Sequence, residues 1–283
     1  MPSGTGSMVG KCVPRLGWLA TRAGRRTIAP LLLLLLLPAC QGSGSGGSPS
    51  PPAGSPSAQS VTTTGDAMPG SCSGDSPTQV SPGTYRLDEG TVLPGLTVTV
   101  PSGWTCAENL PGQFSMSPPG DPNEAMLFWV DMVAVKSSGA GHGETILKSV
   151  GKTPSALVSW LVHNRDFAIG SRPRSTTVGQ RIPMTSLVVG VSPSVDYGDH
   201  CPAAHNRCAD MFVNPRTWTT GNWYGMGGRT EDRLYIGTIH MHGRPHSFLI
   251  DLDAEDMAHL IRLESAAQPI LGSLTLPTGT VAG

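Results

Sequence analysis

The pattern of apolar and polar positions divides the chain into three parts. Residues 28–39 form one short apolar run, IAPLLLLLLLPA, and Cys40 follows it directly. Residues 40–79 carry few large apolar side chains, so they cannot bury enough surface to offset the loss of chain entropy. From residue 80 onward, apolar positions recur with the spacings of strands and helices. We therefore expect a disordered Gly/Ser/Pro-rich tether at 40–79, one globular domain at 80–277 and a tail at 278–283.

The first half of this domain reads mainly as strands. Residues 97–100 (TVTV) alternate between apolar and polar and stop at a Pro-Ser-Gly turn. The most apolar run, at 125–135, predicts one central strand buried on both faces. A hairpin is predicted at 233–241 and 246–252, turning at Gly243-Arg244-Pro245. Shorter strands are expected at 104–106, 113–117, 178–181, 184–191, 212–213 and 273–276, with a loose hairpin at 218–224.

Two helices complete the predicted pattern. Thr153 can cap the first helix, and Pro154 occupies its first position, where a missing N–H does no harm. Asp253 is expected to cap the second helix, and Pro269 to break or restart it. The order of strands, helix, strands, helix and strand predicts an α+β fold, in which an antiparallel sheet carries two main helices.

The N-terminal apolar run has the features of an export signal. Basic residues precede it, and no acidic residue occurs before Asp66. The run has about 12 residues, whereas a membrane-spanning helix needs about 20. An ordinary signal peptide with an incidental cysteine is one interpretation of this pattern.

Leu37, Ala39 and Cys40 resemble the lipobox of bacterial lipoproteins. That resemblance implies that residues 1–39 are a signal peptide, and that Cys40 becomes an acylated first residue carrying palmitate or a similar chain. Two acyl chains on one residue hold a soluble domain stably at a membrane. The expected location is the extracytoplasmic face of the cell membrane.

Charge and composition narrow the possible partners. The formal net charge is -1 and only 14% of residues are charged, which gives no support for nucleic-acid binding. The 36 glycines and 26 prolines suggest translation from a GC-rich genome and hence an actinobacterium.

Four of the six cysteines lie beyond Cys40, and in an exported chain they are expected to pair. Three connectivities are possible. We favour Cys201–Cys208, which closes a small polar loop, and this leaves Cys72–Cys106.

The VPSGW sequence at 100–104, the mid-chain helix and the LGSL sequence at 271–274 together resemble the PsbP-like fold. LpqN-like actinobacterial lipoproteins are similar in combining a lipobox, a tether and one such domain. The resemblance covers most of residues 82–276. It implies a non-catalytic binding or assembly role by analogy, and no functional residue can be carried over.

No sequence motif that resembles a catalytic one has both the residues and the structural setting that catalysis requires. The GSCSG sequence at 70–74 has the spacing of a nucleophile elbow, but it places a cysteine at the nucleophile position within the tether. His240 and His242 are predicted to share one face of a strand with His246 across the turn. An envelope hydrolase using these three histidines is therefore an alternative function.

A metal-binding lipoprotein is the second alternative. His200, Cys201, His205 and Cys208 are close in sequence and could form a tetrahedral zinc site. Outside the cytosol, Cys201 and Cys208 are expected to pair with each other, which argues against a zinc site. We therefore expect no metal and no cofactor.

Four residues around Gly221 form the candidate ligand-binding surface: Arg216, Trp218, Trp223 and Tyr224. Flat rings beside guanidinium and amide groups suit contacts with sugars or peptides, although these tryptophans could instead pack in the core. Trp129 and Trp160 are expected to be core residues. The sequence thus predicts a lipid-anchored, non-enzymatic binding domain whose partners are the membrane and an envelope protein, glycan or lipid.

Overall fold

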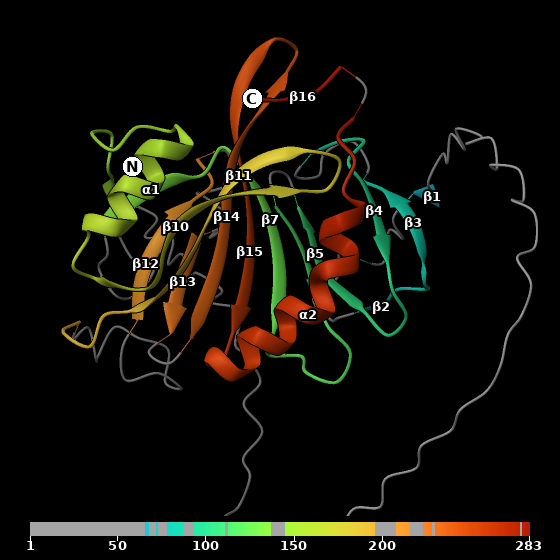
Figure 1. Cartoon of the computed structure of the whole chain (residues 1–283), viewed down its shortest axis with the longest axis horizontal. Helices are drawn as coiled ribbons and strands as arrows, with labels where there is room; N and C mark the ends of the chain where they lie inside the picture. Colours follow the sequence, from blue (N-terminus) through green and yellow to red (C-terminus); the bar gives the residue numbers. More distant parts are fainter. Residues whose placement is uncertain are drawn as a thin grey trace, which may run out of the picture. The chain divides into compact units, whose positions relative to one another are not determined.

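The computed structural model of this chain describes residues 66–67, 72, 78–87, 93–110, 113–136, 145–195, 208–215, 223–227, 230–277 and 279–283. All of these residues belong to one compact unit. They form mostly antiparallel sheets with two helices, so the predicted α+β class is confirmed for this part of the chain (Figure 1).

The largest sheet has β14 (Glu231–Met241), β15 (Arg244–Ala254) and β7 (Ala125–Val130) at its centre. Every pairing in it is antiparallel. From one edge to the other, its strands are β10 (Phe167–Val178), β11 (Ile182–Val191), β14, β15, β7, β6 (Gln113–Ser117), β5 (Thr105–Leu110) and β2 (Thr78–Gln79), and β16 (Val281–Ala282) also pairs with β14.

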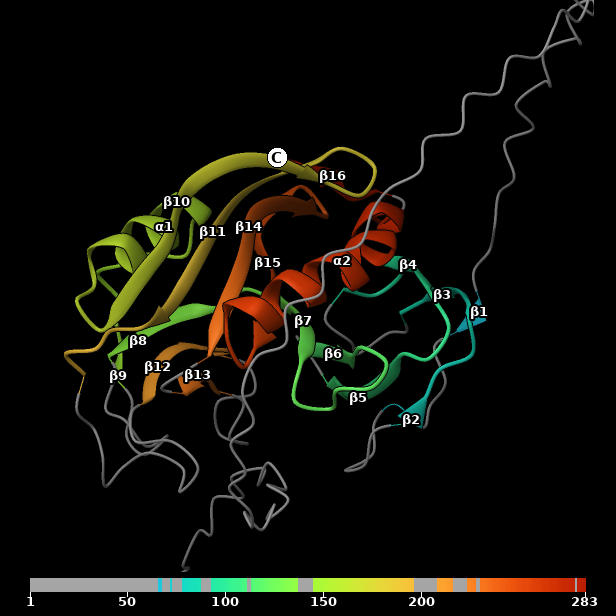
Figure 2. The same cartoon turned by 60° about the horizontal axis from the view of Figure 1, so that its bottom comes forward.

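Two smaller sheets accompany it (Figure 2). One contains β1 (Asp66–Ala67), β3 (Gly83–Arg86) and β4 (Thr97–Val100), with β1 and β3 parallel. The other contains β13 (Trp223–Gly227), β12 (Cys208–Val213), β8 (Val133–Lys136) and β9 (Thr145–Ile146).

The large sheet separates two hydrophobic cores. Successive side chains of a strand point to opposite faces, and the apolar residues of β7 divide accordingly. Phe128 packs in the core that contains α2, whereas Leu127 and Trp129 pack in the core that contains α1. Each of these three side chains is at most 9% exposed. The predicted strand buried on both faces is therefore confirmed at β7.

Helix α1 (Pro154–His163) begins as the sequence predicts. The Thr153 hydroxyl accepts a hydrogen bond from the Ala156 N–H at 3.3 Å. Leu157 and Leu161 are its fully buried side chains. The capping and the apolar stripe together fix this helix on one face of the sheet.

Helix α2 (Met257–Ser273) differs from the prediction in two ways. Its N-cap is Asp256, because Asp253 still belongs to β15. Pro269 lies inside the helix without ending it. The buried side chains Leu263, Ala267 and Ile270 follow the helical period through this position, so core packing outweighs the lost backbone hydrogen bond.

Three predicted strands are corrected by the structure. The run at 125–135 is interrupted at Asp131, whose φ is 59°, so β7 and β8 are separate strands. Residues 179–181 form the turn between β10 and β11 and not a strand. The expected closing strand at 273–276 is reduced to an isolated bridge between Thr97 and Thr275, because α2 extends to Ser273.

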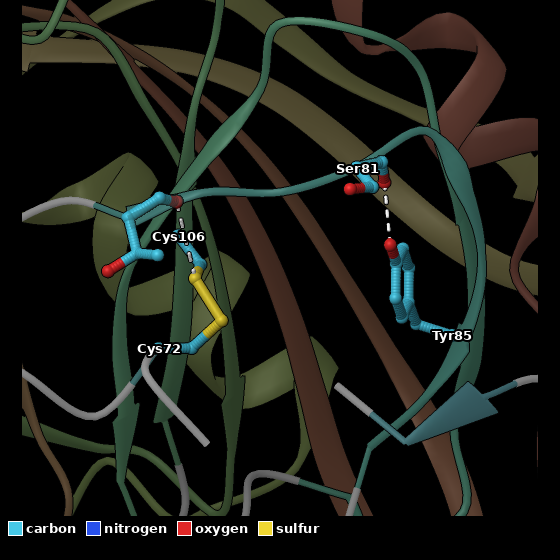
Figure 3. The surroundings of a disulfide bond; sticks show 5 residues. Cys72, Ser81, Tyr85 and Cys106 are labelled. Atoms are coloured by element: carbon cyan, nitrogen blue, oxygen red, sulfur yellow. Dashed lines mark hydrogen bonds between the residues drawn. A yellow bond between two sulfur atoms is a disulfide. The ribbon is translucent and has the colours of Figure 1, made fainter. Parts of the chain in front are cut away.

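The folded part reaches into the stretch that the sequence assigns to the tether. Strands β1 and β2 both precede residue 80. Cys72 forms a disulfide with Cys106 of β5, and both side chains are fully buried (Figure 3). Nearby, the Tyr85 hydroxyl donates a hydrogen bond to the Ser81 carbonyl at 2.6 Å. The disulfide therefore fixes this early segment to the edge of the large sheet.

Candidate functional site

The candidate site is an open pocket of about 410 Å³ where the end of α1 meets the end of β8. Helix α1 supplies one wall, and the loop that leads from it into β10 supplies another. The lining residues are Lys136, Leu147, Trp160, His163, Asn164, Arg165 and Asp166.

Hydrogen bonds hold the α1–β10 loop in place. The Asn164 N–H donates to the Trp160 carbonyl at 2.9 Å and ends the helix. The Asn164 side chain accepts the Asp166 N–H at 3.0 Å. The Asp166 carbonyl in turn accepts the Ser192 N–H at 2.9 Å. These bonds preform the pocket wall, which lowers the ordering cost of binding a ligand.

Trp160 belongs to both the core and the pocket. It is half-buried, and its ring lies edge-on to Phe167 with centroids 5.6 Å apart. A second contact, to Phe212, has centroids 5.8 Å apart. The predicted core role is therefore correct but incomplete, since the same ring also lines the pocket.

The pocket combines charges of both signs. Lys136 and Arg165 carry positive charges, and Asp166 is acidic. The carbonyl end of α1 adds partial negative charge, because a helix dipole is negative at its C-terminus. A ligand with both donors and acceptors and one apolar face suits these surroundings better than a simple anion does.

The side chains of the predicted ligand-binding surface lie outside what the structure describes. Arg216 and Trp218 lie outside the described residues. For Trp223 and Tyr224 the structure gives the backbone alone, in β13, paired with Val213 and Phe212 of β12. Sequence analysis missed the pocket residues because none of them belongs to a sequence motif. The signal that was present is a helix C-terminus at which Trp160, His163 and Arg165 are close in sequence.

The predicted cysteine cluster is partly described. Cys208 is 7% exposed in β12 and is disulfide-bonded, with a partner outside the described residues. A disulfide sulfur is not a thiolate, so Cys208 lacks the form that binds zinc. His200, Cys201 and His205 lie outside the described residues, as does Cys40.

The three histidines near the β14–β15 turn do not share one face. His246 is paired with Ile239, and His240 with Pro245, so His240 and His246 point to opposite sides of the sheet. His242 lies in the turn itself with φ 51°. His246 Nδ1 is instead 2.8 Å from Asp131 Oδ2. The predicted imidazole cluster is therefore not formed.

A set of buried aspartates lies on the α1 face of the large sheet. Asp232 and Asp253 are direct cross-strand neighbours, and Asp251 is two residues from Asp253. Asp232 and Asp251 are fully buried and Asp253 is 7% exposed. None of the three is without a partner. Because these carboxylates are buried and partnered, they form part of the interior and not an open site.

No protein-family model and no curated protein matches this chain. In the part of the chain that the structure describes, neither helix is long and apolar enough to cross a membrane.

Proposed function

We propose that this chain is a lipid-anchored lipoprotein of the extracytoplasmic face of the cell membrane, whose folded domain binds an envelope ligand without catalysis. The observation that carries the proposal is the basic leader with its apolar run ending at Leu37-Pro38-Ala39-Cys40. A low-complexity tether then separates Cys40 from the folded part. As a random coil, the stretch before β1, residues 41–65, would span roughly 25–30 Å, enough to lift a domain off lipid headgroups.

The pocket at the end of α1 is the ligand site that this proposal favours. Trp160 offers a ring face, Lys136 and Arg165 offer donors, and Asp166 offers an acceptor. Sugars present hydroxyl groups that both donate and accept, together with apolar C–H faces that pack on aromatic rings. The ligand class we propose is therefore an envelope glycan.

Intact-mass measurement of the protein extracted from membranes tests the anchor. The expected species is an acylated chain that starts at Cys40. The matched variant Cys40→Ala should lose the acyl mass and leave the membrane fraction. An unacylated chain that starts elsewhere would show a secreted protein and overturn the anchor.

Binding of soluble envelope glycan fragments tests the pocket. Arg165→Ala and Lys136→Ala should each weaken binding about tenfold, the loss expected when a charge-assisted hydrogen bond worth roughly 1.5 kcal/mol is removed. Lys152→Ala is the control, because Lys152 is exposed outside the pocket. Equal affinities for all three variants and the unmodified chain would exclude this pocket.

A further inference from the structure

A second polar cluster lies on the α2 side of the fold, away from the α1 pocket. It consists of Asp121 and Glu124, from the loop that joins β6 to β7, and His259, from the first turn of α2. Each residue offers one potential ligand atom, and these atoms all lie within 4.8 Å of one another. We call it the Asp121/Glu124/His259 cluster.

Glu124 is the buried member of the cluster, with 4% of its surface exposed. Its Oε1 has no hydrogen-bond partner within the described part of the chain. Arg262 is a cation close to it, with Nη2 3.9 Å from Oε1 and a side chain that is 61% exposed. A buried carboxylate oxygen without a hydrogen bond is costly unless a cation compensates it. Burial, and secondly the Asp121 carboxylate, raise the pKa of Glu124, which reflects that cost.

The other two members are held in place by local hydrogen bonds. One Asp121 carboxylate oxygen accepts the Asn123 N–H at 3.0 Å, which fixes the loop. His259 Nδ1 lies 2.8 Å from Oδ1 of Asp256, the N-cap of α2.

An ionised Asp256 can only accept, so Nδ1 is the protonated ring nitrogen and the remaining lone pair is on Nε2. A histidine that ligates a metal ion usually donates its second N–H to a carboxylate in this way. The Asp256–His259 pair therefore has the arrangement expected of a metal ligand and its supporting residue.

We propose that the Asp121/Glu124/His259 cluster binds one divalent transition-metal ion of the zinc class. One imidazole and two carboxylates are a donor set that zinc accepts, with water completing the coordination. The two carboxylates carry more negative charge than Arg262 cancels. Arg262 and the positive end of the α2 dipole both oppose a cation, so the ion is held less tightly than in a site without them.

Zinc titration of the chelator-treated full chain, kept in detergent at pH 7.5, tests the proposal. The chain should bind Zn²⁺, and His259→Gln and Glu124→Gln should each weaken binding at least tenfold. Asp256→Asn keeps a residue that can cap α2 but removes the charge behind His259, so it should also weaken binding about tenfold. Absence of zinc binding by the unmodified chain would overturn the proposal.

His242→Asn is the control, because His242 is exposed in the turn between β14 and β15, outside both sites, and asparagine also adopts the positive φ found there. It should leave zinc affinity unchanged. An equal loss in His242→Asn and His259→Gln, or no loss in His259→Gln, would place zinc elsewhere and overturn the assignment. Glu124 is buried, so its variant is first checked by far-UV circular dichroism. If it does not fold, Asp121→Asn replaces it and must show the same tenfold loss. None of these variants alters Cys40 or the α1 pocket, so failure here leaves the proposed function standing.

Discussion

At the scale of single residues, the contact between Glu231 and Gly190 shows how the sheet admits a partly buried carboxylate. The two residues are paired across β11 and β14. A Cβ atom at Gly190 would lie 3.1 Å from both carboxylate oxygens of Glu231. The glycine therefore makes room for the carboxylate, and burial raises the pKa of Glu231 above its ordinary value of 4.5.

This raised pKa predicts a pH-dependent gain from Glu231→Gln. A carboxyl whose pKa is higher in the folded state favours folding when it is protonated. That contribution is complete below about pH 4.5, the usual pKa of an unfolded glutamate, and is lost as the pH rises through the folded-state pKa. The variant has no charge to bury, so it should be more stable than the unmodified chain at pH 7 and about equal to it at pH 4. Urea unfolding at both pH values measures the two differences.

Glu255→Gln is the control for this experiment, because Glu255 is exposed after β15. It should change the unfolding free energy by about 0.5 kcal/mol or less. The same stability gain for Glu231→Gln at pH 4 and pH 7 would contradict the assigned cause.

At the scale of elements, the turn between β10 and β11 packs against the end of α2. Gly179 has φ +56°, and a Cβ atom there would lie 2.3 Å from the Leu274 carbonyl oxygen. That same oxygen accepts the Gln180 N–H at 3.0 Å. The turn and the helix end are therefore joined through one carbonyl group.

Two glycine substitutions should act in opposite directions. Gly179→Ala should cost at least about 2 kcal/mol, because it combines a left-handed backbone with a clash against backbone. Gly272→Ala should stabilise by about 0.5–1 kcal/mol, because Gly272 lies in α2 with nothing within 4 Å of its Cβ position. Urea unfolding midpoints measure both. A neutral Gly179→Ala variant would show that this turn does not pack as described.

The sequence predicted the central strands and both helices, but it predicted no strand at 167–177, where β10 lies, and it misplaced three turns. Asp131, Arg181 and His242 are the non-glycine residues with positive φ in the described part of the chain, at 59°, 70° and 51°. Each lies at a turn that was misplaced: the break in 125–135, the turn at 179–181 and the hairpin tip. Turn prediction relies on Gly, which adopts positive φ without strain, and on Pro, whose ring fixes φ near about −65°. A non-glycine residue adopts them only when the surrounding structure compensates the strain.

The same reasoning explains which candidate residues could be found. The continuous apolar run at 125–135 marked the buried strand β7, and the apolar stripe after Thr153 marked α1, because both signals are local. The α1 pocket and the Asp121/Glu124/His259 cluster each join segments that are distant in sequence. Neither leaves a local pattern, and the loop at 118–124 showed only its prolines and glycine, which indicate a turn.

At the scale of the whole molecule, the Cys72–Cys106 disulfide ties the first folded segment to the large sheet. Its loop spans a sequence separation of 34. In the chain-entropy model, closing such a loop contributes about 4 kcal/mol, through restriction of the unfolded state. Strand β2 makes a short contact with the sheet, pairing two residues with Thr105 and Cys106 of β5. The disulfide therefore contributes much of the stability with which β2 is held at the edge of the large sheet.

Removal of the disulfide should give a characteristic non-additive result. Cys72→Ala, Cys106→Ala and the double variant should each lose about 2–4 kcal/mol, because either single change already breaks the cross-link. Urea unfolding of all three measures the loss, and amide hydrogen exchange should be faster at 78–87 than in β14 and β15. A double variant that loses the sum of the two single losses would show that packing of the two sulfurs, and not the cross-link, stabilises this edge. Because each variant keeps Cys208, the result reports on this one disulfide, whereas a chemical reductant would reduce both.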